Sequence, residues 1–248
     1  MFISLKKALV FAAAASICLF AAGCGNSSDS ASSSSSKDAN KEITVGVTPG
    51  FHADVMEQVK KEAAKQGILI KVIEFSDYVT PDVALSNKEI DMNSYQHKPY
   101  MDNMVKDKGL KLVSIGQTVV APIGLYSHKI KSLDELKDGA VVAIPNDPTN
   151  GARGLLLLQK AGLIKVKDGV KYPTPADVAE NPKHLQFREL EAAQIPRSLD
   201  DVDLAAVNTN YALEAGIDPV KDALFREDKD SPYANIIAVH EDDKDNPT

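Results

Sequence analysis

The sequence contains little cysteine and no tryptophan. Its two cysteines, in a chain of 248 residues, are Cys18 and Cys24. Cys18 lies in the apolar run 8–22, which follows two lysines and is typical of a cleaved export signal, because it is too short and too rich in alanine to span a membrane. Removal of this signal leaves one cysteine, which excludes a disulfide within the mature chain. The fold must therefore depend on its hydrophobic core.

The sequence also lacks the motifs of common catalytic sites. It contains no nucleophile elbow, no phosphate-binding loop, no HExxH and no paired cysteines. Its five histidines are spread along the chain, one to a segment: His52, His97, His128, His184 and His240. Three of them could meet in the fold and bind zinc, although scattered histidines more often lie on the surface or support other side chains. We expect no enzyme, no cofactor and no metal, and keep zinc binding as an alternative.

Basic residues are also too few for a nucleic-acid-binding protein. Lys and Arg number 28 against 35 Asp and Glu, so the net charge is −7 and the sequence pI is about 5.3. Binding to nucleic acid requires a basic face that neutralises phosphates. We therefore expect no nucleic acid among the partners.

The N-terminal segment predicts a lipid anchor. The export signal ends in Ala21-Ala22-Gly23-Cys24, which resembles the bacterial lipobox, although leucine is commoner at the position of Ala21. Residues 26–41 are rich in serine and too poor in apolar residues to order themselves. We interpret residues 1–23 as a lipoprotein signal peptide and 24–41 as a lipidated Cys24 with a flexible tether, on the extracytoplasmic face of the cell membrane. A plain secretory signal with an incidental cysteine is the alternative.

The rest of the chain predicts an α/β fold in two lobes. Strands are expected at 43–47, 68–75, 91–95, 112–120, 123–126, 140–144, 185–190, 203–207 and 233–239. Helices are expected at 52–65, 80–88, 96–108, from 147 to 160 and at 209–215, with further helix starts at Ser132 and Thr174. Val55, Met56, Val59 and Ala63 form the apolar stripe of the first helix. We expect one lobe from 42–120 plus 230–248 and another from 121–229, because the βα pattern restarts after an extended crossing near 118–123 and the chain returns near 226–232.

The stretch DPTNGARGLLLLQK at 147–160 predicts an anion receptor. A turn leads to the start of a helix, where backbone N–H groups lack partners inside the helix and carry the positive end of its dipole. Arg153, placed in the first turn, adds a planar group suited to a carboxylate. An ordinary buried helix whose arginine lies in solvent is the alternative.

Aromatic and amide side chains form a second set of candidate binding residues. Four rings lie at or beside the ends of predicted elements: Tyr78, Tyr95, His97 and Tyr100. They suggest the wall of a cleft, although a single tyrosine of this kind more often only packs. Asn208 ends a strand, and Asn235 interrupts an apolar strand, where its amide needs partners. Those partners are either backbone groups or a zwitterionic ligand.

Four stretches of the sequence resemble a known family. They read FSDYVTPDVALSNKEIDMNSYQHKPYMD, IPNDPTNGARGLLLLQKAGLI, DLAAVNTNYALEAGI and EDKDSPYANIIAV. They resemble the methionine-binding lipoproteins of the NlpA family, which are the substrate-binding components of methionine ABC importers. The resemblance covers nearly all of 43–239, and its QHKPY and DPTNGAR runs are highly specific to that family. Relatives often have phenylalanine at the position of Tyr95, and continue into a further helical segment beyond that of Thr248.

The resemblance implies a fold, a function and roles for the candidate residues. The fold is a two-lobed periplasmic-binding-protein-like one with a ligand cleft between the lobes. The ligand's side chain would lie among Tyr78, Tyr95, His97 and Tyr100, Arg153 would hold its carboxylate, and Asn208 and Asn235 would complete the polar anchor. The implied partners are L-methionine or a close analogue and an ABC permease with its ATPase, and we expect a monomer. Alternatives are another small amino acid, a methionine dipeptide, or a zinc-binding or adhesin-type lipoprotein.

The lipid anchor can be tested at Cys24. We expect the Cys24→Ala protein to stay uncleaved or to become soluble, because the residue that receives the lipid is missing. Fractionation of cells, with the protein followed by blotting, measures both outcomes. Complete membrane retention of a processed variant would contradict the anchor.

Overall fold

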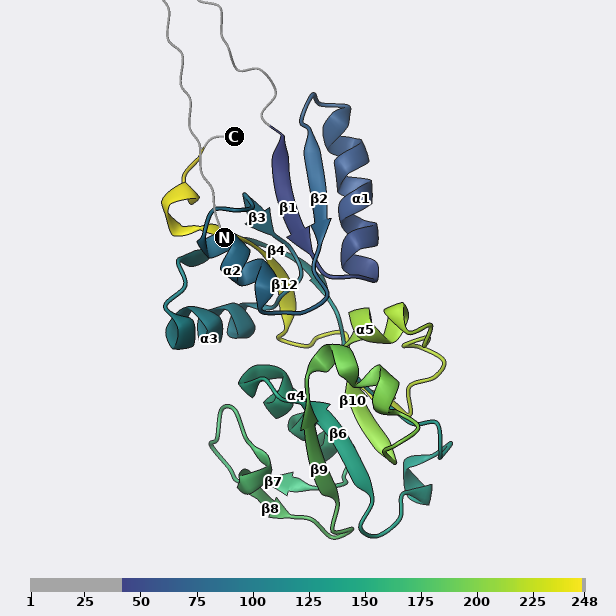
Figure 1. The fold of residues 1–248 in the computed structure, drawn as a ribbon. Helices are drawn as coiled ribbons and strands as arrows, with labels where there is room; N and C mark the ends of the chain where they lie inside the picture. Colours follow the sequence, from purple (N-terminus) through teal and green to yellow (C-terminus); the bar gives the residue numbers. More distant parts are fainter. Residues whose placement is uncertain (1–41, 247–248) are drawn as a thin grey trace, which may run out of the picture. The chain divides into compact units, whose positions relative to one another are not determined.

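The computed structural model describes residues 42–246. The predicted signal peptide, Cys24 and the serine-rich tether lie outside these residues, and so do Pro247 and Thr248. Figure 1 shows the helices and strands of this part of the chain, and most of the strands belong to two five-stranded sheets.

The first sheet has five strands in the order β2-β1-β3-β12-β4. Its strands are β1 (Ile43–Val47), β2 (Ile70–Glu74), β3 (Met92–Asn93), β4 (Leu112–Val120) and β12 (Ala234–His240). β1 pairs in parallel with β2 and β3, whereas β12 runs antiparallel to β3 and β4. Three helices belong to this lobe: α1 (Phe51–Ala64), α2 (Thr80–Ser86) and α3 (Lys98–Lys108).

The second sheet also has five strands, in the order β11-β5-β10-β6-β9. Its strands are β5 (Gly124–Tyr126), β6 (Val141–Pro145), β9 (Gln186–Leu190), β10 (Leu204–Val207) and β11 (Phe225–Arg226). It is accompanied by the helices α4 (Pro148–Lys160) and α5 (Thr209–Glu214) and by a small antiparallel pair, β7 (Lys165–Val166) and β8 (Val178–Glu180). Short 3-10 turns are η1 (Leu133–Glu135), η2 (Pro175–Asp177), η3 (Ala192–Gln194), η4 (Pro196–Ser198) and η5 (Glu241–Asp243).

Two segments of chain connect the sheets. The chain leaves the first sheet after β4 and enters the second at β5, and it returns between β11 and β12. The last strand, β12, then inserts between β3 and β4 rather than adding to an edge. The structure is therefore an α/β fold with two lobes joined by two crossings, as expected.

The helix α4 lies unusually close to the second sheet. A Cβ atom on Gly151 would lie 2.6 Å from the carbonyl oxygen of Pro145, and one on Gly154 would lie 3.2 Å from the Cβ of Ala206. Glycine at these positions lets the helix approach the end of β6 and the side chain of Ala206 on β10. Leu155 and Leu158, which are both fully buried, then fill the core of the lobe. This close packing holds Arg153 at the end of the sheet that faces the crossings.

The apolar stripe predicted for α1 is partly wrong. Met56 is buried, but Val55 and Val59 are 41% and 43% exposed. The buried face instead includes His52, which lies one helical turn before Met56. Val55 is rotated by about 100° from Met56, since an α-helix has 3.6 residues per turn. The sheet therefore contacts only a narrow stripe of this helix.

The helices expected after Ser132 and Thr174 are 3-10 turns. Both capping signals are present: the Ser132 hydroxyl accepts from the Asp134 N–H, and Thr174 forms a reciprocal capping box with Asp177. The backbone nevertheless becomes extended at Leu136 and Val178, directly after one turn. A cap satisfies the first donors of a helix but adds nothing to its later turns. After η2 the chain enters β8, which pairs with β7, and after η1 Leu136 is buried in the core of the lobe.

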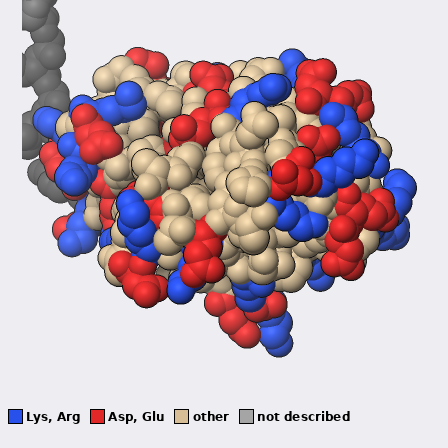
Figure 2. Space-filling model, turned by 90° about the horizontal axis from the view of Figure 1, so that it is seen from below, with Lys and Arg blue, Asp and Glu red and all other residues tan. Residues whose placement is uncertain are grey.

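One face of the molecule shows how the charged side chains are distributed. Figure 2 shows that acidic and basic side chains are mixed over this face, around areas that carry neither. No continuous basic area is visible on it. This face therefore lacks the electrostatic footprint of a nucleic-acid-binding surface.

The corrected face of α1 makes a prediction about stability. We expect Met56→Ala to lower the free energy of unfolding by about 2–5 kcal/mol, because it leaves a cavity in a packed core. The matched control is Val59→Ala on the same helix, which should lower the free energy of unfolding by no more than about 0.5 kcal/mol because this residue is exposed and lies outside the core. Urea denaturation measures both values, and equal losses would show that the sheet contacts the broader stripe.

Candidate ligand-binding site

A pocket lies where the two lobes meet. Its lining combines aromatic rings with a few polar groups, as is typical of small-molecule sites. It is lined by side chains from both lobes: His52, Tyr78, Tyr95, Gln96, His97, Tyr100, Ala121, Asn150, Arg153, Asn208, Thr209, Asn210 and Asn235. The structure thus brings together all seven residues that the sequence singled out. The other lining residues were not predicted from the sequence: His52, Gln96, Ala121, Asn150, Thr209 and Asn210.

Three tyrosine rings form one wall of the cavity. The ring centroids of Tyr78 and Tyr95 are 5.8 Å apart, and Tyr100 meets each of them edge-on at 5.8 and 6.5 Å. The Tyr95 hydroxyl donates to the Tyr78 carbonyl at 2.5 Å, and the Tyr78 hydroxyl donates to Asn210 Oδ1 at 2.6 Å. Burial raises the pKa of all three phenols, so the wall is uncharged at neutral pH. It offers aromatic faces and edges to an apolar group.

His97 links the two lobes through an amide. Its Nδ1 accepts the Tyr100 N–H at 3.1 Å as the cap of α3, so Nε2 carries the proton and donates to Asn150 Oδ1 at 3.1 Å. Asn150 Oδ1 also accepts from Asn208 Nδ2 at 3.0 Å. Burial, and secondarily the charge of Arg153, lower the pKa of His97 to about 3, so this ring is neutral. Asn150 belongs to the DPTNGAR run, which was the available signal for it.

His52 and Asn235 form a second buried pair. Asn235 Nδ2 donates to His52 Nε2 at 2.6 Å and to the Tyr95 carbonyl at 3.0 Å. His52 Nδ1 then carries the proton and donates to Thr48 Oγ1 at 2.8 Å. Burial lowers the pKa of His52 to about 3. The amide in the apolar strand therefore has protein partners for its Nδ2, one backbone and one side chain.

The anion receptor predicted at the start of α4 is wrong in part. Arg153 lies in the second turn of the helix, which begins at Pro148. Asp147 occupies the N-cap, and its carboxylate accepts the N–H groups of Thr149 and Asn150. An aspartate is a favoured N-cap because it satisfies these donors and neutralises the dipole, so those donors are already occupied. The alternative of a solvated arginine is also wrong, since Arg153 is 3% exposed.

Arg153 instead makes a buried ion pair with Glu227. Nε donates to Oε1 at 2.7 Å and Nη2 donates to Oε2 at 2.5 Å. Nη2 also donates to the Ala121 carbonyl at 2.7 Å, and the guanidinium stacks on Tyr233 at 4.4 Å from the ring centroid. These contacts use Nε and Nη2 and leave Nη1 outside the pair. Glu227 could not be predicted from the sequence, because no spacing rule connects it to a residue 74 positions earlier.

Two residues that line the cavity have an amide oxygen without a partner in the protein. Within the described residues, Gln96 Oε1 and Asn208 Oδ1 are buried and accept no hydrogen bond. Buried carbonyl oxygens are nearly always paired, so such an oxygen calls for a donor from outside the protein. An ammonium or hydroxyl group in the cavity would supply that donor.

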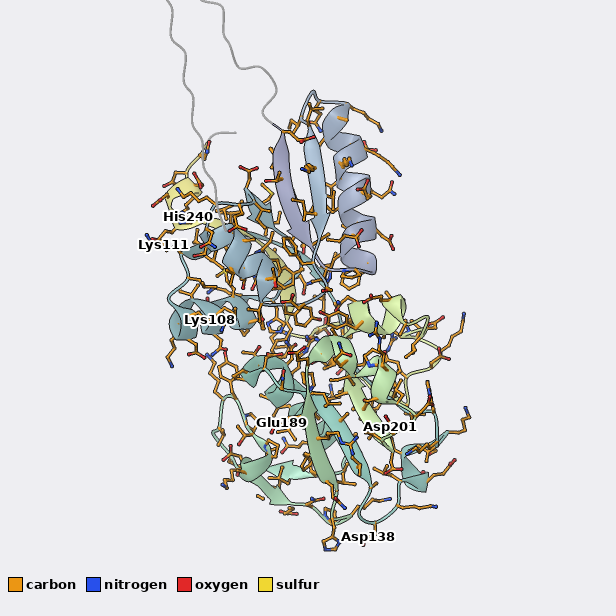
Figure 3. The ribbon with its side chains drawn as sticks, viewed as in Figure 1. Lys108, Lys111, Asp138, Glu189, Asp201 and His240 are labelled. Carbon is orange, nitrogen blue, oxygen red and sulfur yellow. The ribbon has the colours of Figure 1, made fainter. Side chains whose placement is uncertain are left out.

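The other histidines lie elsewhere. His128 pairs with Asp200, and His184 pairs with Asp138. Figure 3 labels His240 in the lobe of the first sheet, and Asp138 at the far end of the lobe of the second sheet. Across residues 42–246, no three His, Cys, Asp or Glu side chains lie close enough together to hold a metal ion. In the same part of the chain, no helix is both long and apolar enough to cross a membrane.

The fold and the cavity define a class of protein. Two α/β lobes joined by two crossings, with a pocket lined from both lobes where they meet, are the architecture of periplasmic substrate-binding proteins. The NlpA lipoprotein family model matches residues 43–248, and the chain belongs to this family.

Curated relatives and solved structures agree with this membership. The chain is 55% identical to the D-methionine-binding lipoprotein MetQ of Salmonella typhi over 228 residues, which are 90% of this chain and 81% of the relative. It is 56% identical to the protein of the same name from Escherichia coli K12 over 213 residues, 84% of this chain and 78% of the relative.

Among solved structures, a nutrient binding protein from Burkholderia cenocepacia bound to methionine aligns with a TM-score of 0.80 at 52% identity, over 83% of this chain and 87% of that one. A crystal structure of the methionine binding protein MetQ aligns with a TM-score of 0.81 at 55% identity, over 83% and 86% of the two chains.

The buried His97 makes a prediction about pH. Its pKa is about 3 in the native protein and 6.5 as a free side chain, so below pH 6.5 the unfolded state binds more protons and stability falls. At about pH 5 this loss is about 2 kcal/mol relative to neutral pH. The His97→Asn variant should lack this loss. The difference in free energy of unfolding between wild type and variant should therefore shrink by about 2 kcal/mol from neutral pH to about pH 5.

Denaturation curves at about pH 7.5 and about pH 5 measure this difference. Burial raises the pKa of Asp82 to about 7, so its contribution to the free energy of unfolding rises as the pH falls, opposite to that of His97. Asp82 is present in both proteins, so its contribution drops out of the comparison. A stability difference that does not change with pH would show that His97 is not responsible.

Proposed function

We propose that this chain is the substrate-binding lipoprotein of a methionine ABC importer, which captures methionine outside the cytoplasmic membrane. The observation that carries the proposal is the cavity, where an aromatic wall, a guanidinium and an unpartnered amide oxygen converge. The support from relatives is that proteins more than half identical to this chain are named for D-methionine, and that a similar structure holds methionine.

The aromatic wall suits a thioether. Tyr78, Tyr95 and Tyr100 surround one end of the cavity, with His97 beside them. Sulfur is polarizable and makes favourable contacts with the edges of aromatic rings, at about 5 Å and about 0.3–1.5 kcal/mol each. We place the methionine side chain there.

The polar end suits an amino-acid zwitterion. Arg153 lines the cavity and pairs with Glu227 through Nε and Nη2. Its third nitrogen, Nη1, is the donor for the ligand's carboxylate. Asn208 Oδ1 is the acceptor for the ammonium group. Asn235, held by His52, completes the anchor.

Residues 42–120 with 230–248 are proposed as one lobe and 121–229 as the other. Opening and closing would occur at the two crossings, which is how proteins of this class capture and release a ligand. The partners would be a permease with its ATPase, and the mature protein would be a monomer held by lipid on Cys24 at the extracytoplasmic face of the membrane. A methionine dipeptide or another small amino acid is the alternative ligand.

The ligand can be tested by thermal unfolding of ligand-stripped protein. L-methionine or D-methionine at about a thousand times its dissociation constant should stabilise the fold by about 4 kcal/mol, because a ligand that binds only the native state shifts the unfolding equilibrium. Both stereoisomers and a methionine dipeptide are compared. Circular dichroism or calorimetry is the readout, since the chain has no tryptophan.

Norleucine is the matched control for sulfur, since it keeps the shape of the side chain. It should bind more weakly than methionine by no more than about 1.5 kcal/mol. Zinc should produce no comparable shift. Stabilisation by zinc but not by methionine would refute the proposed substrate.

A further inference from the structure

Glu227 is held in place by groups from three parts of the chain. Its Oε1 accepts from Arg153 Nε, and its Oε2 accepts from Arg153 Nη2. Oε2 also accepts from the Ile123 N–H at 3.2 Å and from the Ser231 hydroxyl at 3.1 Å. Ile123 belongs to the first crossing and Ser231 to the second. The side chains of Arg153 and Glu227 are only 3% and 13% exposed, so the pair is shielded from water.

The ion pair makes the cavity nearly neutral. Of the residues that line the cavity, Arg153 is the one whose side chain is charged at neutral pH. The histidines there are neutral, since burial lowers their pKa to about 3, and the other polar lining residues are phenols, amides and a hydroxyl. Glu227 supplies the opposite charge directly behind Arg153. Nearby, Asp147 is engaged in capping α4, and the pKa of the buried Asp82 is raised to about 7.

We propose that Glu227 determines the charge class of the ligand: by balancing Arg153, it makes the cavity select a zwitterion over an anion with the same side chain. This inference rests on the proposed function, because it concerns the same cavity. A zwitterion enters a neutral site without leaving net charge there. An anion brings the same carboxylate without the ammonium that offsets it, so it would leave a net negative charge in the site, and an uncompensated charge in a shielded site is costly.

Asn208 adds to this selection. Its unpartnered Oδ1 can accept from an ammonium or from a hydroxyl group, so the hydrogen bond alone does not separate the two ligand classes. The two classes are separated by the positive charge of the ammonium, which the hydroxyl group lacks. Two ligands that differ only at this position therefore measure the charge balance of the site.

The test compares methionine with 2-hydroxy-4-(methylthio)butanoate, in which a hydroxyl replaces the ammonium and the net charge becomes −1. Calorimetry gives both dissociation constants for the wild type, for Glu227→Gln and for Asp228→Asn. Asp228 is the matched control: it is the next residue, and it loses a negative charge from an exposed pair with Lys160 that lies outside the cavity.

Wild type and Asp228→Asn should bind methionine far more tightly than the hydroxy acid. Glu227→Gln should reduce this preference by about tenfold or more, because close charge pairs at binding sites have effects of at least this size. A folded Glu227→Gln protein with the wild-type preference would overturn the inference. Failure of the wild type to bind methionine would instead refute the proposed function, so the two failures are distinguishable.

Glu227→Gln leaves a buried guanidinium without its counter-ion, which destabilises the fold. The melting temperature of this variant is therefore also measured with each ligand. The hydroxy acid should stabilise this variant more, relative to methionine, than it stabilises the wild type, because the anion replaces the lost charge. A variant that stays unfolded with the hydroxy acid present would count against the inference. So would a larger relative stabilisation by methionine.

Discussion

The buried ion pair between Arg153 and Glu227 is the contact on which the junction of the lobes depends. Arg153 comes from α4 in the second lobe, whereas Glu227 lies in one crossing and hydrogen-bonds to the other through Ile123. The carbonyl of Ala121 accepts from the same guanidinium. Separating the two side chains would leave a buried charge unpaired, at a cost of about 3–5 kcal/mol. A hinge motion that keeps the pair intact avoids this cost.

The remaining contacts across the cavity are between neutral groups. His97 donates to Asn150, Tyr78 to Asn210, and Tyr211 to the carbonyl of residue 76. A neutral hydrogen bond that exchanges with water contributes about 1 kcal/mol, so these bonds can break and reform at modest cost. A strong contact at the crossings and weak contacts across the cavity are compatible with lobes that open without losing their connection.

Patterns that extend over several residues predicted the structure best. The strands expected at 43–47 and 112–120 match β1 and β4, and the helix expected over DPTNGARGLLLLQK matches α4. Single-residue signals did less well. Ser132 and Thr174 each cap a helix start, but only one turn follows, because the backbone becomes extended directly after it. Val55 and Val59 are apolar but exposed, because the sheet contacts only one side of α1.

The sequence by itself determined which residue types are available and how each segment folds locally. Asp147 caps α4, Gly109 ends α3 in the left-handed conformation that glycine favours, and the family resemblance marked the seven side chains that meet in the cavity. Only the tertiary structure decided their partners. Glu227 meets Arg153 across 74 positions, and His52 meets Asn235 across 183. Such pairings depend on which strands become neighbours, and local periodicity contains no information about that.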